Sequence, residues 1–222
     1  QLITAVLDRL DTYPVVAITG PRQAGKTTLA KAILQQVQRS ALYLDMELPS
    51  DANKLRNPEF FLRENEARLI VIDEVQRQPA LFPLLRGLVD QRREPARFLI
   101  LGSASPELLR QSSETLAGRI AYLELPPFHR KEVATYPPKR HWLRGGFPLA
   151  LLAPSDEAAF DWLTQFTTTF VERDLPQFGL TAPAQTLRNL LLMLTGMHGG
   201  LLNYSTLARS LGLTVPTVKR YL

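Results

Sequence analysis

The chain has 222 residues, a formal net charge of +5 and 45% hydrophobic residues, which is typical of a globular protein with a buried core. It contains no cysteine, which excludes disulfides and thiolate metal sites, and we expect a cytoplasmic protein. No apolar run reaches the roughly 18 residues of a membrane span, and the N-terminus lacks a signal-peptide pattern. Because the chain starts at Gln1 rather than Met, we expect a fragment of a longer protein.

A phosphate-binding pattern follows the first strongly apolar stretch. Residues 20–27 fit G-x-x-x-x-G-K-[ST] between a predicted strand and a predicted helix. Glycines let backbone N–H groups turn inward around phosphate oxygens, Lys26 would neutralise phosphate charge, and the Thr27 hydroxyl would hold Mg²⁺. The alternative is a strand-to-helix turn without a ligand. The expected nucleotide-binding residues are Gly20, Pro21, Arg22, Gln23, Ala24, Gly25, Lys26, Thr27 and Thr28.

Apolar stretches alternate with helix-forming stretches through the first half of the chain. The clearest helices are residues 26–36 and 81–91, and the expected strands are residues 15–19, 41–45, 69–73, 98–102 and 120–124. This alternation predicts an α/β fold in which helices cover both faces of a parallel sheet. Ligands of such sheets bind at the carboxyl ends of the strands, so the residues that follow each strand are the candidates for chemistry.

Two carboxylates end the third expected strand, which is typical of a Walker B element. Asp73 would support Mg²⁺ through its water shell, and Glu74 would accept a proton from the attacking water or orient it. The alternative is that Asp73 caps a following helix. Asp45 and Glu47 end the second strand in a similar way, and we interpret that pair as a solvated strand end.

Small polar residues follow the fourth strand, and an arginine precedes the fifth. Ser103 or Ser105 could present a hydroxyl to the γ-phosphate or to the attacking water, although Ser105 is also a good cap for a helix that starts at Pro106. Arg119 could stabilise transition-state charge in its own subunit or in a neighbour. The alternative for Arg119 is a structural ion pair.

These motifs together resemble one family. The motifs occur in the order 20–28, 44–45, 72–76, 102–105 and 116–119, and the resemblance continues at residues 143–148 and 171–175. They look like the AAA-like P-loop ATPases of bacteria and archaea whose C-terminal region is a domain of unknown function called DUF4143. The resemblance implies a P-loop NTPase sheet in the order 5-1-4-3-2, with ATP and Mg²⁺ as ligands. The stretch from Phe128 to Arg144 is shorter than this family leads us to expect, and the family usually continues beyond Leu222.

The second half of the chain changes in composition. Residues 126–140 are rich in proline and basic residues, which is typical of a linker or hinge, and helical patterns return at 156–170 and 184–193. We expect an ATPase domain at 1–135, a linker and helical lid-like region at 136–185, and a truncated helix-turn-helix or winged-helix region at 186–222.

The last residues carry the pattern of a helix-turn-helix. Ser205 would cap the first helix, Gly212 would form the turn, and Thr214 would cap the second helix. Three outward-facing residues would then be able to contact DNA: Thr217, Lys219 and Arg220. The alternative is a packing or protein-contact module.

The sequence therefore predicts an Mg²⁺-dependent ATPase with a C-terminal helix-turn-helix. The competing hypothesis is a nucleotide-gated switch that binds DNA or a protein partner with little turnover. A third hypothesis is a protein-interaction module with a vestigial site. No membrane contact is expected, and an oligomer is left open.

Overall fold

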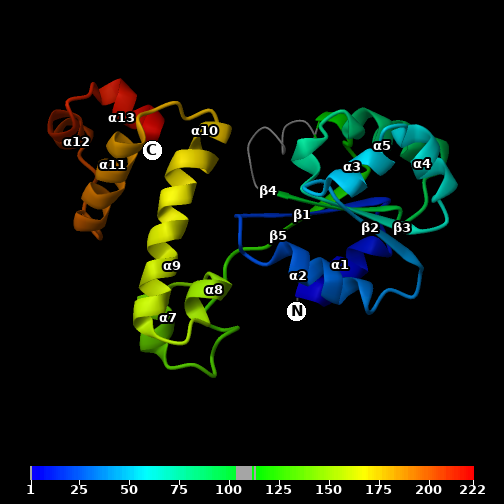
Figure 1. Cartoon of the computed structure of the whole chain (residues 1–222), viewed down its shortest axis with the longest axis horizontal. Helices are drawn as coiled ribbons and strands as arrows, with labels where there is room; N and C mark the ends of the chain where they lie inside the picture. Colours follow the sequence, from blue (N-terminus) through cyan, green and yellow to red (C-terminus); the bar gives the residue numbers. More distant parts are fainter. Residues whose placement is uncertain (1, 104–111, 113) are drawn as a thin grey trace. The chain divides into compact units, whose positions relative to one another are not determined.

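The computed structural model describes residues 2–103, 112 and 114–222 (Figure 1). The chain divides into two compact units, Gln1–Asp156 and Glu157–Leu222. The first unit holds a sheet and the helices that cover it. The second unit is helical in its described residues.

The sheet contains the strands β1 (Val15–Gly20), β2 (Ala41–Asp45), β3 (Leu69–Asp73), β4 (Phe98–Ser103) and β5 (Ile120–Glu124). Every pairing between them is parallel, which confirms the predicted parallel sheet. The order is β2-β3-β4-β1-β5, which is 5-1-4-3-2 when it is counted from β5. Since parallel strands end at one edge, the register brings Gly20 beside Ser103 and Asp45 beside Asp73.

Helices cover both faces of the sheet, as predicted (Figure 1). The helices α1 (Leu2–Leu10) and α2 (Lys26–Leu34) pack on one face, and α4 (Pro58–Glu64) and α5 (Leu81–Gln91) pack on the other. The short helix α3 (Pro49–Lys54) follows β2.

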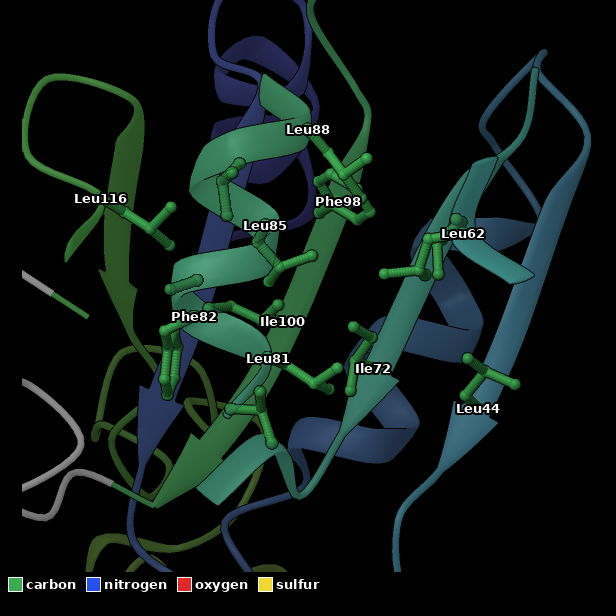
Figure 2. Close-up of a cluster of buried hydrophobic side chains, with 14 of the residues drawn as sticks. Leu44, Leu62, Ile72, Leu81, Phe82, Leu85, Leu88, Phe98, Ile100 and Leu116 are labelled. Atoms are coloured by element: carbon green, nitrogen blue, oxygen red, sulfur yellow. The ribbon is translucent and has the colours of Figure 1, made fainter. Parts of the chain in front are cut away.

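Strand residues alternate between the two faces because the side-chain period of a strand is two. Val15 and Ala17 join the cluster under α5, whereas Val16 and Ile18 join the cluster under α1 and α2. Figure 2 shows the α5 cluster, in which Leu85 points from the helix toward the strands. Both faces of the central strands are therefore apolar, and polar chemistry is confined to the strand ends.

The region after β5 is more ordered than a linker. It contains α7 (Pro138–Arg144) and α8 (Pro148–Leu151), and α7 starts within the stretch that we predicted to be a linker, because proline is well tolerated in a first helical turn. The backbone N–H of Phe128 donates to the carbonyl of Gly146 at 2.8 Å, and the His141 ring is 2.8 Å from the Phe128 carbonyl. These two contacts hold the segment around Phe128 against α7 and the residues that follow it.

The second unit ends in three helices. Its elements are α9 (Asp156–Thr169), the π-helical η2 (Phe170–Asp174), α10 (Leu175–Gln177), α11 (Ala184–Gly196), α12 (Tyr204–Leu211) and α13 (Val215–Tyr221). Leu190, Leu207 and Val218 form the buried centre of α11, α12 and α13. The described residues of this unit contain no strand, so a winged form is not confirmed.

The turn between α12 and α13 has the predicted chemistry at two of three positions. Gly212 is left-handed at φ 65°, and the Thr214 side chain accepts from the Thr217 backbone N–H, as expected. The cap of α12 is Asn203 rather than Ser205, since the helix starts at Tyr204 and Ser205 already lies in its first turn.

Among the described residues, no helix has both the length and the apolar character that crossing a membrane requires.

Replacing Leu85 by alanine tests the α5 core. Leu85 is fully buried, so Leu85→Ala should lower the free energy of unfolding by about 2–5 kcal/mol. Leu149, which is 60% exposed, gives the control Leu149→Ala, whose effect should stay within about 0.5 kcal/mol. Urea denaturation followed by circular dichroism measures both, and equal losses would contradict this assignment of the core.

Candidate functional site

The loop between β1 and α2 is shaped by its two glycines. A Cβ on Gly20 would lie 2.3 Å from the backbone oxygen of Leu125, so only glycine allows this close approach. Gly25 has φ 100° and precedes α2, and nothing lies within 4 Å of the point where its Cβ would sit. The loop therefore turns tightly and leaves open space at the start of α2.

Lys26 is a buried cation in this loop, with only 5% of its surface exposed. Its Nζ donates to the backbone carbonyls of Gly20 and Pro21, each at 3.0 Å. Burial lowers the pKa of Lys26, and the nearby carboxylates of Glu74 and Asp73 partly offset this effect. The loop thus holds a positive charge at its centre, where an anion would bind.

Thr27 and Asp73, the two predicted magnesium residues, are in direct contact. The Thr27 Oγ1 hydroxyl donates to Asp73 Oδ2 at 2.6 Å, so the lone pairs of the threonine oxygen remain available to a cation. A hydroxyl and a carboxylate are oxygen ligands of the kind that Mg²⁺ uses with phosphate and water. The donor set therefore fits the ion. Within the described part of the chain, no group of three His, Cys, Asp or Glu side chains offers another metal site.

Tyr43 also contacts Asp73, which the sequence did not indicate. Its hydroxyl donates to Asp73 Oδ2 at 2.5 Å. Burial raises the pKa of Tyr43 above its ordinary value, and the Asp73 carboxylate raises it further. The phenol therefore stays protonated at neutral pH and acts as a donor.

Glu74 follows Asp73 in a left-handed conformation, with φ 55°. Its backbone N–H donates to Asp73 Oδ1 at 2.9 Å, and the Gln76 side-chain amide donates to the Glu74 carboxylate. The next element, the 3-10 helix η1 (Val75–Arg77), has Glu74 at its N-cap position and no side-chain cap. The alternative role of Asp73 as a helix cap is therefore wrong.

Ser103 lies at the end of β4, directly beside the start of the phosphate loop. Its Cα pairs with Gly20 in the sheet register, and it is 7% exposed. Ser105, the other candidate for contact with the γ-phosphate, lies outside the described residues.

Arg119 is not at this site. Its backbone carbonyl accepts from the N–H of Val15 at 3.2 Å, which places it where β1 starts, at the opposite edge of the sheet from Gly20. Its guanidinium binds both carboxylate oxygens of Asp90, at 2.5 and 3.0 Å. The prediction that Arg119 serves the phosphate site of its own chain is therefore wrong, and the ion-pair alternative is what the structure contains.

A pocket of about 400 Å³ opens beside the phosphate loop. Apolar atoms of α1, the loop and the chain after β5 line it, and Glu124, His129 and Glu132 add polar groups. Its apolar lining residues are Leu2, Ala5, Ala24, Leu125, Pro126 and Phe128. The sequence did not reveal this pocket, since segments more than a hundred residues apart in the chain form it together.

Comparison with protein families identifies the first unit. A family model described as AAA domain matches residues 12–134, which is more than half of the chain. The chain belongs to this AAA domain family. A second model, a domain of unknown function called DUF8612, matches residues 138–222. The C-terminal region is therefore DUF8612, and the resemblance to DUF4143 was wrong.

Two curated relatives of the AAA domain chain come from mycobacteria. They are the uncharacterized protein Rv2008c of Mycobacterium tuberculosis and the uncharacterized protein Mb2031c of Mycobacterium bovis, each 47% identical over 209 residues. The match covers 94% of this chain and 47% of each relative. The chain thus spans about half the length of the curated relatives it matches.

Among solved structures, the fold is similar to that of the Walker-type ATPase PABY2304 of Pyrococcus abyssi. The TM-score is 0.62 at 16% sequence identity, and the match covers 99% of this chain and 86% of that chain. At this identity the likeness shows the fold alone. The match to the AAA domain is the finding that suggests nucleotide binding.

The corrected position of Arg119 leads to a test. Arg119→Ala should leave the affinity for an ATP analogue unchanged, because the guanidinium lies at the opposite edge of the sheet. The ion pair with Asp90 lies at the surface, so its loss should leave the protein folded. Isothermal titration measures the affinity. A clear loss of binding would show that Arg119 contributes to the nucleotide site, which would contradict this assignment.

Proposed function

We propose that the AAA domain binds ATP with Mg²⁺ and hydrolyses the β–γ phosphoanhydride bond. The observation that carries this proposal is the direct hydrogen bond between Thr27 and Asp73, 2.6 Å long, beside the buried ammonium of Lys26. A cation, an oxygen donor set and a tight glycine loop meet at one edge of a parallel sheet. This combination fits a bound nucleoside triphosphate.

Each residue has a separate role in the proposed reaction. Lys26 exchanges the carbonyls of Gly20 and Pro21 for phosphate oxygens, and Thr27 and Asp73 hold Mg²⁺, which neutralises phosphate charge when bound. Water attacks the γ-phosphorus, the bond to the bridging oxygen breaks, and ADP and phosphate form. Glu74 accepts the proton of the attacking water.

Ser103 and the pocket beside the phosphate loop also have roles in this proposal. The Ser103 hydroxyl contacts the γ-phosphate or the attacking water from the end of β4. The pocket beside Ala24 receives the base of the nucleotide, because its apolar walls suit a flat aromatic ring and it adjoins the phosphate loop.

Two substitutions separate binding from turnover. Lys26→Ala removes the buried charge that donates to the loop carbonyls, and it should weaken ATP binding about 10–100-fold. Glu74→Gln should keep ATP binding and lower hydrolysis about 10²–10⁴-fold.

The matched control for the second substitution is Glu59→Gln. Glu59 is an exposed glutamate on α4 that pairs with Arg63, so its loss should not alter turnover. Phosphate release measures hydrolysis, and equilibrium titration measures binding. Hydrolysis by Glu74→Gln at the parent rate would remove Glu74 from the role of base.

A nucleotide-gated switch that binds DNA is the second candidate function. The charge of the three-helix end of the chain favours it, because no Asp or Glu occurs after Asp174. The basic residues Arg209, Lys219 and Arg220 are exposed on α12 and α13. A positive surface on a helix-turn-helix suits contact with a DNA backbone.

The DNA proposal has its own test. Anisotropy of labelled duplex DNA should report binding that weakens as salt rises, and Lys219→Ala and Arg220→Ala should each lower the log–log salt slope by about 1. Arg56→Ala, at an exposed arginine of the first unit, is the control and should leave the slope unchanged. Binding that is indifferent to salt would exclude phosphate contact and favour a protein partner.

A further inference from the structure

Three hydrogen bonds converge on the carboxylate of Asp73. Oδ2 accepts from the hydroxyls of Thr27 and Tyr43, at 2.6 and 2.5 Å, and Oδ1 accepts from the backbone N–H of Glu74 at 2.9 Å. Asp73 is 2% exposed, so protein groups replace most of the water that would otherwise solvate this charge. The Glu74 bond comes from the neighbouring residue, whereas the Tyr43 bond crosses from another strand.

The pairing of β2 with β3 places Tyr43 next to Asp73. Strands β2 and β3 are paired so that Tyr43 lies opposite Val71, and Asp73, two residues after Val71, projects on the same face. The tyrosine ring packs against the apolar cluster under α1 and α2, and the Lys31 Nζ lies 5.9 Å from its centroid. The ring of Tyr43 therefore contributes to the core, and its hydroxyl reaches the Asp73 carboxylate.

We propose that Tyr43 is a positioning residue for Mg²⁺, an inference that rests on the proposed function. Its hydroxyl fixes the Asp73 carboxylate in the orientation that accepts the hydrogen bond from the Thr27 hydroxyl. With that proton directed to Asp73, the lone pairs of the Thr27 oxygen face the metal position. Tyr43 touches neither nucleotide nor metal, and it acts through Asp73 as outer-shell partners of metal ligands do.

Tyr43→Phe isolates the hydroxyl, because phenylalanine keeps the ring and its packing. The experiment titrates Mg²⁺ into the chain in the presence of a nonhydrolysable ATP analogue and measures analogue binding by fluorescence. The half-saturating Mg²⁺ concentration should rise about 10–100-fold in Tyr43→Phe. Analogue affinity in EDTA should equal that of the parent, because the phosphate loop itself is unchanged.

A matched control removes a different tyrosine hydroxyl from the same sheet. The Tyr122 hydroxyl on β5 donates to Ser112 Oγ at 2.7 Å, and Tyr122→Phe should leave the Mg²⁺ requirement at the parent value. Thermal unfolding in EDTA reports whether each variant is folded. A lost Mg²⁺ response in both variants would mean that hydroxyl removal acts through general stability, and this would overturn the proposal.

The remaining outcomes separate this inference from the proposed function. A parent chain that binds the analogue without any Mg²⁺ dependence would contradict the proposed function itself. A normal parent with an unchanged or lowered Mg²⁺ requirement in Tyr43→Phe would overturn only the role of Tyr43. A lowered requirement would show that the hydroxyl competes with the metal for the carboxylate.

Discussion

The site depends on one buried charge, the ammonium of Lys26. A cation that is 5% exposed needs partners, and the loop supplies the carbonyls of Gly20 and Pro21, each at 3.0 Å. The carboxylates of Asp73 and Glu74 add negative charge from the neighbouring end of β3. The fold meets this electrostatic requirement by ending β1 and β3 at the same edge of the sheet. A phosphate group would satisfy the same cation and release the carbonyls.

The apolar sheet keeps this charged cluster in place. The side chains of β1, β3 and β4 point alternately into one core or the other. Both faces of these strands are therefore apolar, and polar side chains are confined to the strand ends. Thr27, Tyr43 and Asp73 come from α2, β2 and β3 and meet on the face that α1 and α2 cover. The hydroxyls of Thr27 and Tyr43 donate to the nearly buried carboxylate of Asp73, which leaves the lone pairs of the Thr27 oxygen available to a cation. The packing of the core and the orientation of the candidate metal site are thus linked through Tyr43.

The sequence predicted those features that depend on local pattern. The bounds of β2, β3 and β5 match the expected ranges because short apolar runs bounded by polar residues leave little choice of strand. The phosphate-loop pattern was visible because the ligand fixes its spacing, and Asp73 was a candidate because it ends an apolar strand. The sequence did not indicate Tyr43, because its role needs the pairing of β2 with β3, and the carboxylates Asp45 and Glu47 were the only chemical signal at the end of that strand. Arg119 was misplaced because proximity to a strand in sequence does not say which end of the sheet a side chain serves.

A structure of the chain with a nonhydrolysable ATP analogue and Mg²⁺ tests the central claim most directly. The account predicts that the Lys26 Nζ leaves the Gly20 and Pro21 carbonyls for phosphate oxygens, with the Thr27 oxygen on the metal and the Thr27 hydroxyl still donating its hydrogen bond to Asp73. An analogue bound away from residues 20–28, with Lys26 still on its own carbonyls, would contradict the account.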